Sequence, residues 1–120
     1  MAQGTSHIQG FLEGEDALAT LNAFTAMGVK IEGPKDGKVT VHGVGMQGLK
    51  APGKTLDMGN SGTSIRLLAG LLAGAGIEVE LSGDVSLSKR PMRRVTDPLA
   101  LMAANIETNE GGTPPLKIHP

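Results

Sequence analysis

The sequence predicts an α/β (α+β) fold in which helices alternate with short strands. Three stretches carry apolar residues at helical spacing, and the shorter stretches between them alternate apolar and polar residues as half-buried strands do. Glycine or proline stands at most of the junctions, where the chain must turn. A chain of 120 residues also suits one compact domain with a usable core.

The first part of the chain predicts a strand, a helix and a hairpin. Residues 6–11 are typical of a short strand, and residues 16–27 carry leucine, alanine and phenylalanine at helical spacing. Gly28 can end this helix, because glycine adopts the left-handed conformation without a steric penalty. Residues 29–41 alternate apolar and polar side chains on either side of a turn at 34–37, which predicts a hairpin.

The rest of the chain predicts two further helices, each followed by at least one strand. A glycine-rich connection over residues 43–59 precedes the first of them. Pro91 suits the first turn of the second, where the fixed φ of proline fits and its missing N–H is not needed. In order, the predicted elements are a helix over 61–73, a strand over 77–81, a helix over 91–104, and strands over 106–108 and 116–118.

A helix followed by a hairpin occurs twice, at a shift of 77 residues and without a gap. Gly28 corresponds to Asn105, the next most favourable residue for a left-handed helix end, and His42 corresponds to His119. Repeated units of this kind bury their faces against one another, although any two helix-hairpin units share part of this pattern. The chain begins after the first element of one unit and ends on the last strand of the next. We therefore expect it to be part of a longer polypeptide.

Composition excludes several classes of function. Eleven Lys and Arg against 12 Asp and Glu give a net charge of −1, and there is no Trp or Tyr, so we expect no nucleic-acid partner. Without cysteine there is no disulfide, thiolate nucleophile or cysteine-ligated zinc. The three histidines lack metal-ligand spacing, so we predict no metal and no cofactor. With neither a signal peptide nor a run of ~18 apolar residues, we expect a cytoplasmic protein without membrane contact.

The strongest functional signal is Asp57-Met-Gly-Asn-Ser-Gly-Thr-Ser-Ile-Arg-Leu-Leu68, which leads into an apolar helix. The first amides of a helix lack internal partners, and the helix dipole makes that end partly positive. Gly62 lets an anion approach the backbone, and Arg66 adds a full charge one turn inside. Because Asn, Ser and Thr are also ordinary capping residues, a capped helix without a ligand is the alternative.

A second cluster, Ser86-Leu-Ser-Lys-Arg-Pro-Met-Arg-Arg94, places four cations at a strand-to-helix junction. Arginine can bind a phosphate or carboxylate with two hydrogen bonds, although a solvated basic turn is the alternative. Both clusters begin a helix, and the two helices flank one strand, so their openings should face a common crevice. We therefore expect the Gly62 amide and the Arg90 guanidinium to share one anion.

Residues 48–55 match the phosphate-loop pattern G-x-x-x-x-G-K-[ST], which predicts a nucleotide-binding module as a weak alternative. That loop functions only between a strand and a helix whose first turn holds the lysine and the threonine. Here the helix is predicted to begin only near residue 61. The surrounding sequence therefore disfavours a nucleotide site.

The two clusters resemble motifs of the 5-enolpyruvylshikimate-3-phosphate synthases, also called 3-phosphoshikimate 1-carboxyvinyltransferases. The first is the string over residues 57–68, and the second is Leu87-Ser-Lys-Arg-Pro-Met-x-Arg-Val95 with Asp97-Pro-Leu99. The start, His7-Ile-Gln-Gly-Phe-Leu, and the end, Pro114-Pro-Leu-Lys-Ile118, are also similar to family sequence. The resemblance covers the whole chain, and the order and separation of its two motifs make it specific.

The resemblance implies two domains, each of three βαβαββ units, with substrates bound in the cleft between them. About one and a half units are then expected here, within a single partial domain over residues 1–120. Residues 1–43 would be the end of one unit, and residues 38–120 a second, nearly complete one.

The implied reaction transfers enolpyruvyl from phosphoenolpyruvate to shikimate 3-phosphate, in the pathway to aromatic amino acids. The resemblance assigns no catalytic residue to this chain, but it implies a phosphoenolpyruvate or glyphosate site. Gly62 and Arg90 would hold the phosphate, and Asn60 and Thr63 would shape the pocket. Together with Arg66 from the helix argument, the predicted substrate-binding residues are Asn60, Gly62, Thr63, Arg66 and Arg90.

The chain departs from the family where other site residues are expected. The early Lys-Ser-x-Ser-His-Arg segment, the Ser-Ala-Gln-type segment and the second domain with its acid–base residues are absent. Whether the chain is an enzyme by itself therefore stays open, and we expect it to be inert or feeble alone. Two alternatives follow: a non-catalytic structural subdomain that needs the missing segments, and self-association through open strand edges.

Overall fold

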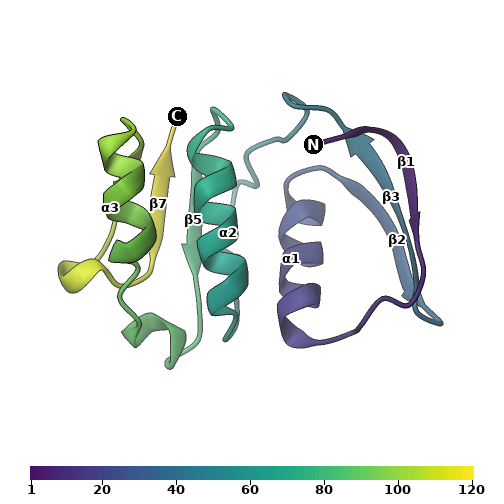
Figure 1. Ribbon diagram of the computed structural model, residues 1–120, viewed down its shortest axis with the longest axis horizontal. Helices are drawn as coiled ribbons and strands as arrows, with labels where there is room; N and C mark the ends of the chain where they lie inside the picture. The colour runs from purple at the N-terminus through teal and green to yellow at the C-terminus, as the bar shows by residue number, and fades with distance from the viewer.

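Two separate sheets carry the strands, and three helices lie side by side against them (Figure 1). The computed structural model describes all residues, Met1–Pro120. None of the helices is both long enough and apolar enough for a membrane span. The elements are β1 (Gln3–Ile8), α1 (Glu15–Ala26), β2 (Lys30–Lys35), β3 (Lys38–Val44), β4 (Leu56–Asp57), α2 (Gly62–Ala73), β5 (Val79–Ser82), α3 (Arg93–Leu101), β6 (Asn105–Glu107) and β7 (Leu116–His119).

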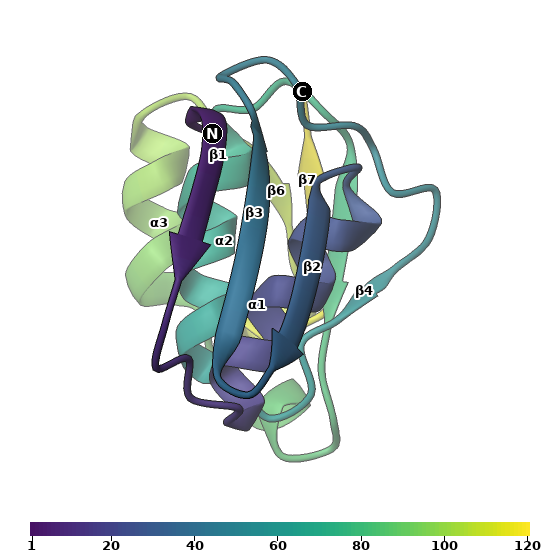
Figure 2. The ribbon, with the colours of Figure 1, turned by 90° about the vertical axis from the view of Figure 1, so that its right-hand side faces the viewer.

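The two sheets differ in how they are built. The first is antiparallel with strand order β1-β3-β2, and Figure 2 shows it in front of α1. The second has the order β4-β5-β7-β6, in which β4 runs parallel to β5 and the other pairs are antiparallel. Since α2 connects the parallel pair, β4, α2 and β5 form a βαβ unit. The mixed helix and strand content predicted from sequence is confirmed.

The core lies mainly between α2 and the second sheet. Sixteen buried apolar residues form one cluster, and Ile65, Leu81 and Ile118 in it have no exposed surface. Helix α2 is the most buried of the three helices, because α1 packs on one side of it and α3 on the other. Burying an aliphatic side chain of this size stabilises the fold by about 1.5–3 kcal/mol. This buried cluster therefore fixes the position of α2 on the second sheet.

Side-chain hydrogen bonds fix the start of α2 and join it to α1. Ser61 caps the helix, because its hydroxyl accepts from the Ser64 amide at 3.0 Å. The Ser64 hydroxyl donates to the Asp16 carbonyl at 2.9 Å and lies 2.7 Å from the Thr20 hydroxyl. Both serines are almost completely buried, and both have partners. The polar residues before this helix thus act partly as caps, as the alternative interpretation held.

Several predicted boundaries are wrong by two or three residues. The first strand lies at Gln3–Ile8 rather than 6–11, because it pairs with β3 in that register. The third helix spans Arg93–Leu101 rather than 91–104, and Pro91 precedes it. A 3₁₀ turn at Leu87–Lys89 and a hydrogen bond from the Met92 amide to the Gly112 carbonyl, at 2.8 Å, delay its start. Strand β4 was not predicted, since only two residues pair.

The helix-hairpin repeat is present, but not without a gap. Ile31 pairs with Val41 in the first hairpin, and Ile106 pairs with Ile118 in the second. The first strands of the two hairpins are thus shifted by 75 residues and the second strands by 77. Asn105 consequently begins β6, and Ala103, at φ +69°, takes the left-handed position that Gly28 takes at φ +95°. The unit boundaries at residues 38 and 43 stay a prediction.

The two hairpins share a histidine–glutamate pair that follows from this register. His42 Nε2 lies 3.3 Å from Glu32 Oε2, and His119 Nε2 lies 3.1 Å from Glu107 Oε2. The pairs are equivalent in the repeat, because each joins the two strands of its own hairpin. Both histidines thus link neighbouring strands of their own sheet.

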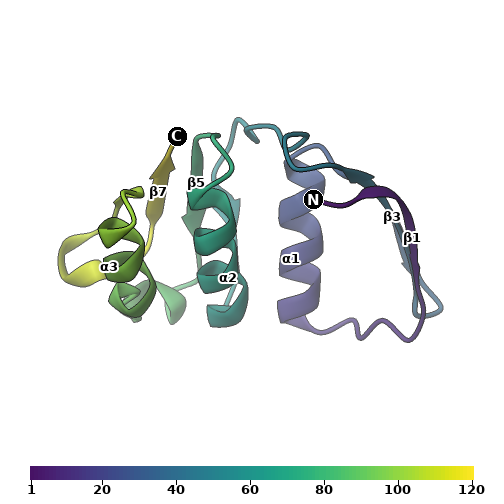
Figure 3. The same ribbon diagram turned by 45° about the horizontal axis from the view of Figure 1, so that its top comes forward.

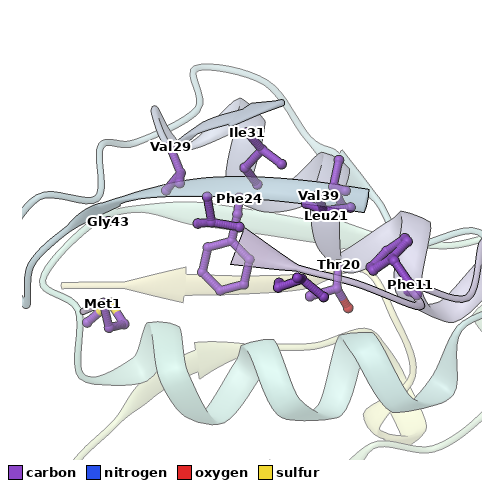
Figure 4. A pocket seen from close by; sticks show the side chains of 12 residues that line it. Met1, Phe11, Thr20, Leu21, Phe24, Val29, Ile31, Val39 and Gly43 are labelled. Carbon is purple, nitrogen blue, oxygen red and sulfur yellow. The ribbon is translucent and has the colours of Figure 1, made fainter. Parts of the chain in front are cut away.

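The first sheet is covered by fewer helices than the second. In the second sheet, α2 lies against β5 and β7 beside α3. The first sheet has only α1, and a mostly apolar groove of about 230 Å³ lies between that helix and the strands (Figure 4). We call it the apolar groove; its twelve lining residues include Met1, Phe11, Leu21, Phe24 and Val39.

Candidate functional site

The parallel pairing of β4 and β5 brings the two predicted clusters together. The chain leaves both strands at the same edge of the sheet, with Leu56 paired to Leu81 and Asp57 to Ser82. Beyond the strands, the Met58 amide donates to the Ser82 carbonyl at 2.7 Å, and the Asp84 amide donates to the Gly59 carbonyl at 2.8 Å. Helices α2 and α3 consequently begin on the same side of the molecule, at the bottom of Figures 1 and 3.

Two arginines converge on the first residue of α2. A Cβ atom placed on Gly62 would lie 2.7 Å from Arg66 Nη1 and 2.8 Å from Arg90 Nη1. Arg66 Nη1 also donates to the Gly62 carbonyl at 3.2 Å, which holds its guanidinium over the helix start. Only a residue without a side chain leaves both guanidiniums in this position. We call Gly62, Arg66 and Arg90 the arginine cradle.

The free amide of the first turn belongs to Thr63 rather than Gly62. The Gly62 amide donates to the Asn60 carbonyl at 3.1 Å, the Ser64 amide donates to the Ser61 hydroxyl, and the Thr63 amide has no partner. The expectation of a bare Gly62 amide is therefore wrong, because the chain turns sharply at Ser61. A bond to the second residue back closes a small ring with a bent angle and is weak.

Asp84 connects the two clusters through its carboxylate. Asn60 Nδ2 donates to its two oxygens at 3.3 and 3.2 Å, and the Leu87 amide donates to Oδ1 at 2.8 Å. These contacts hold Asn60 and the turn before Arg90 in one arrangement. The hydrogen bond from the Leu87 amide is the main reason why the pKa of Asp84 is lowered, and Asn60 and the charge of Arg90 contribute less.

The sequence analysis assigned Asp84 no role, although the position of this aspartate is typical of a residue that caps a turn. An aspartate three residues before the amide of a short turn is a common capping arrangement.

Of the predicted residues, Gly62, Arg66 and Arg90 lie together in the cradle. Asn60 and Thr63 are exposed at its rim, with Asn60 turned toward Asp84.

We expect Asp84→Asn to destabilise the chain near neutral pH and to have little effect in acid. The folded-state pKa of Asp84 is below its ordinary value of 3.8, so its charged form stabilises the native state. That contribution is complete above 3.8 and is lost as the pH falls through the lower folded pKa. Urea unfolding of both proteins at several pH values measures it. A difference that persisted unchanged at the lowest pH would contradict this role, and Asp36→Asn, in the β2–β3 turn, is the control.

The segment over residues 48–55 lacks the geometry of a nucleotide loop. Lys54 and Thr55 precede strand β4 instead of lying in the first turn of a helix. Both residues line a shallow hollow together with Glu78 and Glu80, whose charges repel phosphate. No three His, Asp or Glu side chains lie close enough together to hold a metal ion. Of the candidate nucleotide, metal and anion sites, the arginine cradle is thus the best supported by the structure.

Known proteins resemble this chain over its whole length. The family model described as EPSP synthase (3-phosphoshikimate 1-carboxyvinyltransferase) matches residues 1–120. The 3-phosphoshikimate 1-carboxyvinyltransferases of Hydrogenovibrio crunogenus and Nitrosococcus oceani are 67% and 65% identical to it over 120 and 119 residues. A solved EPSP synthase structure from Acinetobacter baumannii has a TM-score of 0.97 and 62% identity over 99% of this chain.

The matches also show how much of a relative the chain represents. It spans 27% of the length of both curated relatives and of the solved structure. The identities are far above those at which only a fold is shared, and the family model covers every residue. The chain therefore belongs to the EPSP synthase family.

Proposed function

We propose that the arginine cradle binds the phosphate group of phosphoenolpyruvate. The observation that carries the proposal is the convergence of Arg66 Nη1 and Arg90 Nη1 on the first residue of α2. Two guanidiniums, a free Thr63 amide and the positive end of a twelve-residue helix all favour a dianion at one place. No Asp or Glu oxygen lies within 4 Å of either guanidinium, although the charge of Arg90 also acts on Asp84.

In the longer protein, this site would serve the transfer of enolpyruvyl to shikimate 3-phosphate with release of inorganic phosphate. The cradle would hold the phosphate before the transfer and stabilise it as it leaves, because guanidiniums bind the free dianion well. Glyphosate would occupy the same place, since its phosphonate offers similar oxygens. The chain would supply one wall of the site, and the groups that move protons would come from the remaining part.

Replacing Arg90 with glutamine tests the proposal directly. Losing one charge-assisted contact of about 1.5–3 kcal/mol should raise the dissociation constant of phosphoenolpyruvate at least tenfold. Titration of the isotope-labelled chain, following the Gly62 and Thr63 amide signals, gives that constant. Lys38→Gln, which removes an exposed cation from the first sheet, is the control and should leave the constant unchanged. The proposal would be contradicted if the Gly62 amide signal did not shift at high millimolar phosphoenolpyruvate.

The apolar groove favours a second possibility, a structural part that functions only when joined to the rest of the protein. Buried apolar surface is the main source of association energy, and this groove leaves Phe24 and Ile31 partly exposed beside α1. We expect no turnover from the chain alone and measurable turnover when the remaining segments are co-expressed with it. Strand β1 is also an open edge, so self-association in solution, measured by sedimentation, is the competing outcome. Turnover by the isolated chain would contradict this possibility.

A further inference from the structure

A second cationic hollow lies beside the cradle, between the start of α3 and the second turn of α2. Its volume is about 630 Å³, and four residues line it: Arg66, Pro91, Arg93 and Arg94. Three of the four carry a guanidinium, and none carries a negative charge. We call it the arginine hollow. It differs from the cradle because Gly62 and Arg90 do not line it, while Arg66 belongs to both.

The arginines of the arginine hollow form no ion pair within the chain. No carboxylate oxygen lies within 4 Å of Arg66, Arg93 or Arg94, since every ion pair of the protein involves a histidine. The first turn of α3 contains no acidic residue either. Three like charges around one concave space repel one another, and an anion placed between them removes that repulsion. The repulsion among these three arginines therefore favours the binding of an anion.

The fold holds the guanidinium of Arg66 and the stem of Arg93 in place. Arg66 is half-buried and donates to the Gly62 carbonyl. The stem of Arg93 packs over Gly112, where an added Cβ would lie only 2.6 Å from Arg93 Cγ, and the Met92 amide bonds to the Gly112 carbonyl. Met92 itself is completely buried, which fixes the backbone from which the next two arginines extend. Because Arg66 is positioned beforehand, less side-chain entropy is lost at this residue when an anion binds.

We propose that the arginine hollow is a second anion site, which binds a phosphate group beside the cradle. Planar guanidiniums match the oxygens of phosphate with paired hydrogen bonds, so a phosphate dianion suits the hollow better than a monovalent ion. Arg66 lies between the two sites, and two phosphate groups bound at once would be neighbours. This inference goes beyond the proposed function, because it stands whether or not phosphoenolpyruvate occupies the cradle.

Titration of the isotope-labelled chain with inorganic phosphate tests the inference. We expect the amide signals of Arg93, Arg94 and Val95 to follow one binding curve, and those of Gly62 and Thr63 to follow another. Replacing both Arg93 and Arg94 with glutamine should raise the dissociation constant of the first curve at least tenfold and that of the second by a clearly smaller factor. Arg90→Gln should do the reverse. A failure of the proposed function therefore differs visibly from a failure of this one.

The controls separate binding from screening. Lys35→Gln combined with Lys38→Gln removes two exposed charges from the β2–β3 hairpin and should leave both curves unchanged. If the double arginine variant unfolds, Arg94→Gln alone replaces it, because that side chain is exposed. Sodium chloride at the same ionic strength should not move the Arg93–Val95 signals. The inference is overturned if chloride moves them as phosphate does, if the arginine substitutions leave their curve unchanged, or if they follow the Gly62 curve in every variant.

Discussion

Replacing Gly62 with alanine is expected to weaken phosphoenolpyruvate binding at the arginine cradle more than tenfold while leaving the chain folded. The added methyl would lie within 3 Å of Arg66 Nη1 and Arg90 Nη1, so both guanidiniums must move away. Each is the end of a flexible side chain, and the backbone of Gly62 is helical, so the movement costs little stability. Alanine also has a higher helix propensity than glycine. Binding and stability should thus change independently, and titration with urea unfolding measures both.

Gly70→Ala is the matched control for this prediction. Gly70 lies in the same helix, is exposed, and has no atom within 4 Å of an added Cβ. We expect this substitution to stabilise the chain by about 1 kcal/mol and to leave binding unchanged. If Gly62→Ala bound phosphoenolpyruvate as tightly as the parent chain, the cradle would not be the phosphate site.

Replacing Leu81 with alanine is expected to have the largest effect on stability, a loss of about 2–5 kcal/mol. Leu81 is completely buried in β5, pairs with Leu56 on one side and with Leu116 on the other, and packs beneath α2. The shortened side chain leaves a cavity in the cluster that supports the helix start. A domain of this size has a total stability of about 5–15 kcal/mol, so much of the chain would unfold. Urea denaturation followed by circular dichroism measures the change.

Leu101→Ala is the control for Leu81→Ala. Leu101 ends α3 and is 91% exposed, so its truncation should change the free energy of unfolding by less than about 0.5 kcal/mol. A loss at Leu81 no larger than the loss at Leu101 would contradict the core described here. The comparison also shows whether the isolated chain has a cooperative core at all.

Sequence reasoning was most successful where the signal is local. The helix over residues 61–73 was predicted to within one residue of α2, because its apolar spacing and its capping serine and closing glycines are contiguous. It failed at α3, where the hydrogen bond between Met92 and Gly112 comes from a distant segment. The gap in the repeat was invisible for the same reason, since strand register depends on pairing across the hairpin.

For the candidate site, too, the features contained in short stretches were predicted, and those that depend on distant residues were not. Its residue types, its helix start and its resemblance to the EPSP synthases could all be read from the two motifs, and the family membership is confirmed. The role of Asp84 was not found, since its partner Asn60 lies 24 residues away in the sequence. Nor could the sequence show that Arg93 and Arg94 share a hollow with Arg66. The use of Asn60, Gly62, Thr63, Arg66 and Arg90 for substrate binding stays a prediction.

By itself, the sequence determined the elements of this protein and the chemistry available to it, because helix periodicity, capping residues and family motifs are contained in short stretches. The sequence predicted that Gly62 and Arg90 lie near each other, but only the tertiary structure showed that a two-residue strand, β4, parallel to β5, brings them together. It also decided that the first free amide is that of Thr63. The physical reason is that hydrogen bonds between distant strands, and the packing that supports them, set positions that no contiguous stretch encodes.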